Sequence, residues 1–284
     1  MRKVQKLFKA VSFQFIFLIY TASEQTKNRL NKYIRGYVMK IKKVWSRTEN
    51  YTRKGAMMLC EIFALITMFF MLYRKDYANV LTCFLTFVLV LGPNIIEKLF
   101  SCRINTAVYL FVLFYALGPM LGDCYKLYYS TAWWDKALHA FGGVVFALFG
   151  LYLFKLLCTQ NNKIVAAAIF AVCFSVTISV MWEFFEFSAD SLVGTDMQHD
   201  TVITSVESYL LGEQIGEIGR LDGIESVIVN GTELPVKGYL DIGLIDSMTD
   251  MLFETLGAVI VGVIHILDKG KHPVFISTSK KASV

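Results

Sequence analysis

Long runs of apolar residues alternate with shorter polar segments along most of the chain. Each run is close to the roughly 20 residues that an α-helix needs to cross the hydrocarbon core of a bilayer. The pattern therefore predicts an all-α membrane protein, a bundle of about six transmembrane helices. Residues 55–188 would hold the first five helices and residues 247–267 the sixth. The individual runs are 55–73, 77–97, 105–123, 137–157, 164–188 and 248–267.

Residues 1–54 precede the first predicted span and follow a different pattern. Between residues 27 and 45, apolar residues recur at helical spacing, and Lys or Arg residues fill many of the other positions. This arrangement predicts a basic amphipathic helix that lies on an anionic inner leaflet, with packing on a cytosolic partner as the alternative. Residues 7–22 contain a shorter apolar run, for which we favour an interfacial segment over an extra membrane segment or a signal peptide.

The longest polar segment, residues 189–246, separates the last two predicted spans. A stretch around residues 203–217 is expected to form a short helix. Asn230-Gly231 lies between residues of high β-propensity, a pattern typical of a β-hairpin with a type I′ turn. We therefore expect a small α+β insertion outside the membrane.

The composition agrees with a membrane environment. Apolar residues make up 55% of the chain and charged residues only 18%, whereas a soluble domain carries roughly a quarter charged residues. The six cysteines lie mostly in or beside apolar runs and show no paired spacing. We therefore predict neither a disulfide framework nor a zinc finger.

The distribution of positive charge predicts the orientation of the chain. With residue 1 in the cytoplasm and six spans, the inner segments collect 22 Lys and Arg residues and the outer segments six. The positive-inside rule then favours cytoplasmic termini, with residues 268–284 as a cytoplasmic tail. We expect a multi-pass protein of a bacterial cell membrane, with lipids rather than nucleic acid as its partners.

Ionisable side chains gather at the ends of the fourth, fifth and sixth predicted spans, where such groups are energetically expensive and usually functional. Spacings of three or four residues place the members from each span on one helix face. Because the three ends lie on the same side of the membrane in the predicted topology, we expect the side chains to meet near the outer headgroups. They are Asp135, His139, Glu183, Glu186, Asp190, Asp246 and Asp250.

Some of these residues also have a purely structural interpretation. Asp135 suits the N-cap position of its helix, and Ser247-x-x-Asp250 is similar to a capping box. Glu183 and Glu186 are harder to explain in this way, because they follow a long apolar run and are flanked by aromatic residues. Two like charges there repel each other and lose solvation, so they need a proton, a cation or a basic partner.

The chemistry of these side chains predicts a divalent cation. Many carboxylate oxygens and one imidazole suit Mg²⁺, Mn²⁺ or Ca²⁺ better than Zn²⁺. His139 and Glu186 are the candidates for a catalytic role, as general base beside the metal. The expected metal ligands are Asp135, Glu183, Asp190, Asp246 and Asp250.

Such a site predicts a metal-dependent enzyme that acts on a lipid or a cell-envelope precursor at the outer leaflet. One alternative is a non-enzymatic protein that binds or transports ions with the same carboxylates. Another is a structural or regulatory bundle in which the acidic residues only cap and connect helices. The sequence therefore leaves open whether the protein is an enzyme.

Three segments resemble a known family of membrane proteins. They are WDKALHAFGG, WEFFEFSAD and DIGLIDSMTDMLFETLGA, in this order. Together they resemble the YjdF-like family of uncharacterised bacterial multi-pass membrane proteins, and more distantly the VanZ-like proteins associated with glycopeptide-antibiotic resistance. The resemblance covers about residues 50–267 and implies a membrane protein without an established reaction. One departure from the pattern is Glu254, which stands where the resemblance implies an Asn.

Overall fold

The computed structural model describes residues 24–158, 163–271 and 275–277. Within these ranges, six helices are long and apolar enough to cross a membrane, which confirms the predicted helical bundle. They are the part of α2 (Glu24–Tyr73) from Thr48 onward, α3 with α4 (Tyr77–Val90 and Gly92–Leu99), α5 (Thr106–Cys124), α7 (Trp134–Leu157), α8 (Ile164–Val193) and α9 (Leu244–Leu267).

The chain divides into two compact units, Met1–Ala56 and Met57–Val284. The described part of the first unit is helical from Glu24, so the segment 27–45 is a helix as expected. Its position on a leaflet stays a prediction, and the segment 7–22 lies outside the described residues. The second unit holds the other helices and all the strands that the structure describes.

The second span consists of two helices with a break at Leu91. Asp76 caps the start of α3 by accepting hydrogen bonds from the backbone N–H and the side-chain amide of Asn79, at 3.3 and 2.6 Å. These bonds, the side-chain bond first, hold the pKa of the Asp76 carboxyl below its ordinary value. Pro93 lies in the first turn of α4, where a missing backbone N–H costs no helical hydrogen bond.

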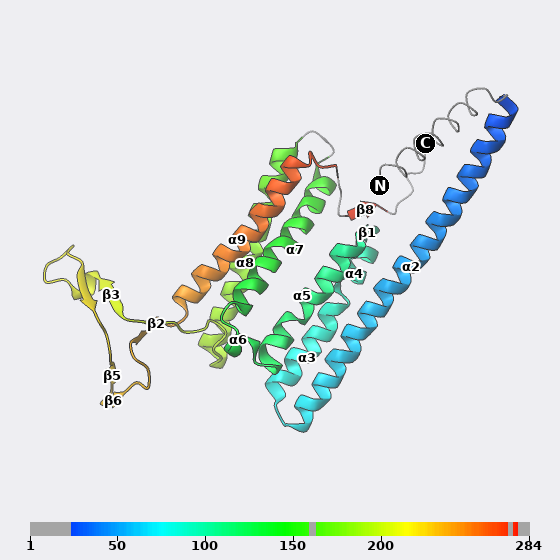
Figure 1. Ribbon diagram of the computed structural model, residues 1–284. Coiled ribbons are helices and arrows are strands. Elements are labelled where there is room, and N and C mark those ends of the chain that lie inside the picture. Colours follow the sequence, from blue (N-terminus) through cyan, green and yellow to red (C-terminus); the bar gives the residue numbers. More distant parts are fainter. Residues whose placement is uncertain (1–23, 159–162, 272–274, 278–284) are drawn as a thin grey trace, which may run out of the picture. The chain divides into compact units, whose positions relative to one another are not determined.

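The last three long helices, α7, α8 and α9, all contact one another and run side by side in Figure 1. Small side chains make close packing possible along their contact. A Cβ atom on Gly143 of α7 would collide with the backbone oxygen of Glu254 in α9, and one on Gly257 of α9 would collide with the backbone oxygen of Ala140. The two helices therefore approach backbone to backbone at these glycines.

A second group of helices packs around a separate core. Ala64 and Met71 from α2, Cys83 from α3 and Met120 from α5 are all buried in it. The two groups are joined where the Trp134 indole N–H donates to the Gly118 carbonyl oxygen at 3.3 Å. A short helix, α6 (Leu127–Ser130), lies between α5 and α7 in the sequence.

The helix ends remote from the acidic side chains carry one strand pair. β1 (Cys102–Ile104) follows α4, and β8 (Phe275–Ser277) follows α9, and the two pair in antiparallel register. The Ile104 N–H also donates to the Glu97 carboxylate at 2.7 Å. These contacts bring the α4–α5 connection and the segment after α9 together, as the predicted topology requires.

The segment between α8 and α9 holds three antiparallel strand pairs. They are β2 (Val202–Ile203) with β7 (Tyr239–Leu240), β3 (Ser205–Ser208) with β4 (Gly219–Asp222), and β5 (Ile228–Val229) with β6 (Thr232–Glu233). Asn230 and Gly231 both have positive φ angles, 54° and 82°, as a type I′ turn requires. The predicted hairpin is therefore confirmed.

The expectation of a short helix around residues 203–217 is wrong. Ser205–Ser208 forms strand β3, and only one turn of 3₁₀-helix, Tyr209–Leu211, follows it. Gly212 and Gly219 explain the difference, because a Cβ atom at either position would collide with backbone of the same loop. These close approaches build the β3–β4 connection, and a regular helix would not allow them.

Candidate functional site

The beginning of α7, the end of α8 and the beginning of α9 bring eight ionisable side chains together. We call this set the helix-end cluster. Each helix supplies its members at spacings of three or four residues, apart from one lysine. The members are Asp135, Lys136 and His139 from α7, Glu183 and Glu186 from α8, and Asp246, Asp250 and Glu254 from α9.

Lys136 is the centre of the ion pairs in this cluster. Its ammonium nitrogen lies 3.1 Å from Asp135 Oδ2 and 2.8 Å from Asp250 Oδ1, and it also pairs with Asp246 Oδ1. Asp250 is 1% exposed, so this ion pair partly compensates a carboxylate that has lost almost all of its water. Among the described residues, Lys136 is the only Lys or Arg that pairs with the cluster.

His139 lies between the carboxylates of α7 and α9. Its Nε2 atom is 3.7 Å from both Asp135 Oδ1 and Asp250 Oδ2. Its Nδ1 atom is 3.9 Å from Glu254 Oε2 on the opposite side of the ring. A metal-ligating histidine likewise places one nitrogen toward the ion and the other toward a carboxylate, although the 3.9 Å separation from Glu254 is longer than a hydrogen bond.

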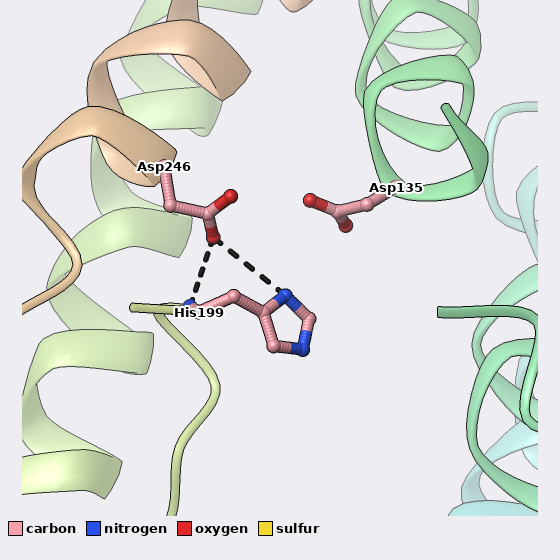
Figure 2. Close-up of side chains that lie close together, drawn as sticks. All are labelled: Asp135, His199 and Asp246. Atoms are coloured by element: carbon pink, nitrogen blue, oxygen red, sulfur yellow. Dashed lines mark hydrogen bonds and ion pairs between the residues drawn. The ribbon is translucent and has the colours of Figure 1, made fainter. Parts of the chain in front are cut away.

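The loop after α8 contributes a second histidine. Figure 2 shows His199, Asp135 and Asp246 pointing toward one another from the loop, α7 and α9. The His199 backbone N–H donates to Asp246 Oδ2 at 3.0 Å, and its ring Nδ1 is 3.8 Å from the same oxygen. The Tyr128 ring lies 5.6 Å from the His199 ring. Burial, followed by the charges of Asp135 and other acids, raises the pKa of the Tyr128 phenol, which therefore stays neutral beside the histidine.

The two carboxylates of α8 are buried and differ in their hydrogen bonding. Glu186 accepts a hydrogen bond from the Trp182 indole N–H at 2.7 Å. Neither oxygen of Glu183 has a hydrogen-bond partner in the described part of the chain, although the residue is only 5% exposed. The Ser247 hydroxyl interacts with Glu183 but lies outside hydrogen-bonding geometry. Glu183 also interacts electrostatically with His139, Asp246 and Asp135, so its carboxylate belongs to the same group of charges.

Among the described residues, two sets of three side chains bring potential ligand atoms close enough together to hold a metal ion. One is Asp135, His139 and Asp250, and the other is Asp135, His199 and Asp246. In each set, one potential ligand atom from each residue lies within 4.8 Å of the others. Asp135 belongs to both sets, which makes it the common point of the candidate site.

Toward the interior of the bundle, the cluster ends at a hydrogen-bonded serine, and a layer of apolar side chains follows. The Ser175 hydroxyl lies 3.3 Å from both Glu254 Oε1 and the Gly143 carbonyl oxygen. The next layer of α7, α8 and α9 consists of Ala147, Ala171, Ala258 and Val261, which form a buried apolar core. Side-chain exposure is 19% at Asp135 but only 1% at Asp250 and 5% at Glu254. The cluster is therefore open toward the helix ends and closed toward the bundle interior.

The capping interpretations do not describe Asp135 and Asp250. The N-cap position of α7 is Trp133, and Asp135 makes a hydrogen bond only to the side chain of Lys136. Helix α9 begins at Leu244, so Asp250 lies one to two turns inside the helix rather than in its cap. The cap of α9 comes instead from Asp241, which accepts from the Ile245 N–H at 2.7 Å.

Three predicted site residues, Glu183, Glu186 and Asp190, belong to neither ligand set, and Asp190 is bound to the following loop instead. Its carboxylate accepts hydrogen bonds from Thr195 Oγ1, the Met197 N–H and the Gln198 N–H, at 2.6, 2.7 and 2.8 Å. All three donors belong to the loop that continues to His199. Asp190 therefore fixes the loop and contributes to the site through it.

Sequence reasoning left three side chains of the site outside its candidate set. Lys136 follows Asp135 directly, so helical periodicity places it on another face, and only its long flexible stem returns it to the cluster. His199 lies in a loop, where no periodicity applies. Glu254 continues the α9 face beyond Asp250 at a spacing of four, and this spacing was the available signal.

The matched family agrees with this architecture. The family model described as a predicted membrane protein, DUF2238, matches residues 55–269, which include most of the first span, the other five spans and the whole helix-end cluster. A search of curated proteins and a search of solved structures found no match. Six apolar helices and a family match over most of the chain lead to one conclusion: this multi-pass membrane protein belongs to the DUF2238 family.

Proposed function

We propose that this protein is a metal-dependent membrane enzyme that acts on a lipid or a cell-envelope precursor at the outer leaflet. The observation that carries the proposal is the pair of ligand sets that share Asp135. Potential ligand atoms of Asp135, His139 and Asp250 lie within 4.8 Å of one another. An ion with metal–ligand distances of roughly 2.0–2.6 Å would reach all three with small side-chain movements.

The charge of the cluster supports a divalent cation. Carboxylates outnumber the available positive groups, since Lys136 is the only permanent cation that pairs with them among the described residues. Several ionised carboxylates in a water-poor site repel one another strongly, and a doubly charged ion removes that repulsion. The oxygen-rich donor set favours Mg²⁺, Mn²⁺ or Ca²⁺ over Zn²⁺.

The arrangement also suggests separate roles for the two proposed catalytic residues. His139 Nε2 faces the ligand set and Glu254 orients the ring, so His139 acts as a ligand in this proposal. Glu186 then remains as the general base, with the Trp182 N–H fixing the direction of its carboxylate. A bound cation would supply charge stabilisation for a phosphate or ester group of the substrate.

Transport of ions is supported less well by the same residues. A transport path needs polar groups that continue through the bilayer. Below Ser175 and Glu254, the contact between the three helices continues with Ala147, Ala171 and Ala258, each of which is 0% exposed. The polar groups of the cluster therefore end at an apolar layer, which favours a surface reaction over passage through α7, α8 and α9.

A purely structural role for the cluster is also supported less well. In that role, each acidic side chain would be held by its own hydrogen bonds. Asp190 fits this description, with three donors. Glu183 does not, because both of its oxygens are without a hydrogen bond from any described residue. A buried carboxylate in this state is destabilising unless it gains a proton or a cation.

The cellular setting belongs to the same proposal. The positive-inside distribution supports a bacterial cell membrane with cytoplasmic termini and the helix-end cluster on the outer side. The basic residues between 27 and 45 support contact with anionic lipids of the inner leaflet. The three sequence motifs support a place near the YjdF-like proteins and, more distantly, the VanZ-like proteins.

The test combines metal binding with turnover in the protein reconstituted in lipid vesicles. Mn²⁺ binding would be titrated, and hydrolysis of a panel of phosphate-bearing lipids would be followed with Mn²⁺ and with EDTA. We expect Glu186→Gln to bind Mn²⁺ normally but to lose turnover, and Asp135→Asn to lose both. Asp222→Asn, at an exposed position of β4, should retain both. Absence of Mn²⁺ binding at millimolar concentration, or turnover that EDTA leaves unchanged, would contradict the proposal.

A further inference from the structure

The lysine of the helix-end cluster forms ion pairs with three of its carboxylates. The Lys136 ammonium pairs with Asp135 of its own helix and with Asp246 and Asp250 of α9. Asp135 and Asp250 belong to one ligand set, and Asp135 and Asp246 belong to the other. One side chain therefore contacts carboxylates of both candidate metal positions.

A divalent cation and the ammonium group compete for the same oxygens. Lys136 lies 3.1 Å from Asp135 Oδ2 and 2.8 Å from Asp250 Oδ1, the distances of direct ion pairs. An ion bound to these carboxylates at metal–ligand distances would repel an ammonium that stayed in contact with them. The two cations therefore exclude each other.

Lys136 is more accessible than the carboxylate it contacts. Its side chain is 21% exposed, whereas that of Asp250 is 1% exposed. A four-carbon stem with free rotation can move the ammonium toward water or lipid headgroups while the carboxylates stay in place. We propose that Lys136 is a tethered cation that fills the site in the metal-free protein and is exchanged for the divalent ion on binding.

A separate observation shows that the lysine alone does not satisfy the cluster. Glu183 is only 5% exposed, interacts electrostatically with His139, Asp246 and Asp135, and has no hydrogen bond from any residue that the structure describes. A singly charged ammonium held by three aspartates leaves this carboxylate uncompensated, and a second positive charge would compensate it. The inference rests on the proposed metal site, and it concerns which group occupies that site in the metal-free protein.

The first experiment compares Mn²⁺ affinity between variants of the reconstituted protein. Lys136→Met removes the competing charge and keeps a long stem, so we expect Mn²⁺ to bind at least about tenfold more tightly. Lys136→Arg keeps the charge and should bind no more tightly than the original protein. Lys237→Met, at an exposed position of the insertion, is the matched control and should change nothing.

The outcomes separate the inference from the proposed function. Equal or weaker binding by Lys136→Met, with clear binding by the original protein, would overturn the tethered cation and leave the metal site intact. Absence of binding in both proteins would overturn the metal site itself. Tight binding by Lys136→Met that Asp135→Asn abolishes would support both.

A second experiment uses the original chain, in case Lys136→Met fails to fold. Lysines would be acetylated under limiting conditions with and without Mn²⁺, and the rate at Lys136 would be followed by peptide mass spectrometry. We expect Mn²⁺ to increase acetylation of Lys136 and to leave Lys237 unchanged, because the released ammonium becomes accessible. An unchanged or slower reaction at Lys136 in Mn²⁺-saturated protein would overturn the inference.

A second inference comes from two cysteines away from the cluster. The Sγ atoms of Cys83 in α3 and Cys124 in α5 lie 3.6 Å apart, although both thiols are free. Formation of a disulfide needs an approach of only about 1.6 Å, because the S–S bond is roughly 2.0 Å long. We infer that this pair is an oxidation site, which closes into a disulfide between α3 and α5 when the protein meets a small disulfide oxidant.

The reaction follows from the exposure of the two thiols. Cys83 is fully buried and Cys124 is half-buried, so Cys124 attacks the oxidant first. The Cys83 thiol then attacks the Cys124 sulfur of the resulting mixed disulfide, and glutathione leaves as the free thiol. In total the two thiols lose two protons and two electrons, and oxidised glutathione becomes two reduced molecules.

The test treats the purified protein with oxidised glutathione and analyses its peptides by mass spectrometry. We expect a cross-linked peptide that contains Cys83 and Cys124, and it should disappear on reduction. In Cys83→Ser, the second step is blocked, so glutathione should remain attached to Cys124. Recovery of both thiols unmodified after prolonged treatment, with Cys173 on the exposed side of α8 modified as a control, would overturn the inference.

Discussion

At the scale of single residues, Asp135 is the side chain on which the site depends most. It belongs to both ligand sets, whereas each of its possible partners belongs to one. Replacement by Asn keeps the shape but removes the charge from both sets. We therefore expect Asp135→Asn to reduce Mn²⁺ affinity more than either Asp246→Asn or Asp250→Asn does, as measured by titration. A larger loss in one of the other two variants would contradict the central place of Asp135.

Replacing Glu183 by Gln should have opposite effects on protein stability in the metal-free and the metal-bound state. In the metal-free state, its buried carboxylate has no hydrogen bond from the described residues. Replacement by the neutral Gln should then stabilise the protein by an amount on the order of 1–3 kcal/mol, because an unsatisfied buried charge is removed. In the metal-bound state, the same change removes a compensated charge and should lower the melting temperature.

Thermal unfolding in detergent, with EDTA and with saturating Mn²⁺, measures both effects. Glu213→Gln, at an exposed position of the insertion, serves as the control and should shift neither melting temperature. Destabilisation of the metal-free protein by Glu183→Gln would show that the carboxylate is satisfied in a way that the structure does not contain.

The residues of the site could be predicted only where helical spacing places them on a common face. Spacings of three and four residues found Asp135, His139, Asp246 and Asp250, and the structure brings these four together. The same rule grouped Asp190 with Glu186, but the chain turns after α8 and Asp190 bonds to the loop instead. The position of a flexible lysine depends on charges more than 100 residues away in the sequence, which no local pattern contains.

At the scale of secondary-structure elements, the contact between α7 and α9 sets the geometry of the site. A Cβ atom on Gly143 would collide with the Glu254 carbonyl oxygen and would lie 3.0 Å from the Ala258 nitrogen. Backbone atoms cannot yield as flexible side chains do, so a larger residue must separate the helices. Separation would move Asp135 and His139 away from Asp250.

We therefore expect Gly143→Leu to lower both the melting temperature and the Mn²⁺ affinity. Gly92→Ala is the matched control, because a Cβ atom at that position meets nothing within 4 Å. Thermal unfolding and Mn²⁺ titration in the same detergent would measure the two effects. Normal Mn²⁺ affinity in a folded Gly143→Leu protein would contradict the role of this helix contact.

The loop between α8 and β2 gives a further prediction at this scale. Asp190 accepts three hydrogen bonds from residues 195–198, and His199 follows directly. Asp190→Ala removes these acceptors and should make the loop more susceptible to limited proteolysis near His199. Ser191→Ala, at the next exposed position, should leave the cleavage rate unchanged. Equal protection of the loop in both variants would show that other contacts hold it.

Helices and strands could be predicted where a single physical requirement determines the local structure. Length and hydropathy located all six spans, because hydrocarbon excludes unpaired backbone polar groups. The Asn-Gly turn located the β5–β6 hairpin. The expected helix around 203–217 was wrong, because tight backbone packing at Gly212 and Gly219 outweighs local helical tendency there. The break between α3 and α4 is likewise a feature that hydropathy alone does not reveal.

At the scale of the whole molecule, the proposed orientation puts the insertion and the helix-end cluster outside the cytoplasm. The prediction is tested by single cysteines at Glu213 and at Lys271 in a chain whose native cysteines are replaced by serine. A membrane-impermeant thiol reagent added to intact cells should label the cysteine at 213 and not the one at 271. Lysed cells supply the control, since both positions are exposed and should then react. Labelling at position 271 alone would reverse the proposed orientation.

The proposed function depends on one property of the protein, the binding of a divalent cation by the helix-end cluster. The most direct measurement is anomalous X-ray diffraction from crystals of the protein soaked in Mn²⁺. We predict an anomalous peak within metal–ligand distance of Asp135, His139 and Asp250, with the Lys136 ammonium moved out of contact with these carboxylates. A map without a peak at the cluster at saturating Mn²⁺, with Lys136 still paired to the aspartates, would contradict the claim.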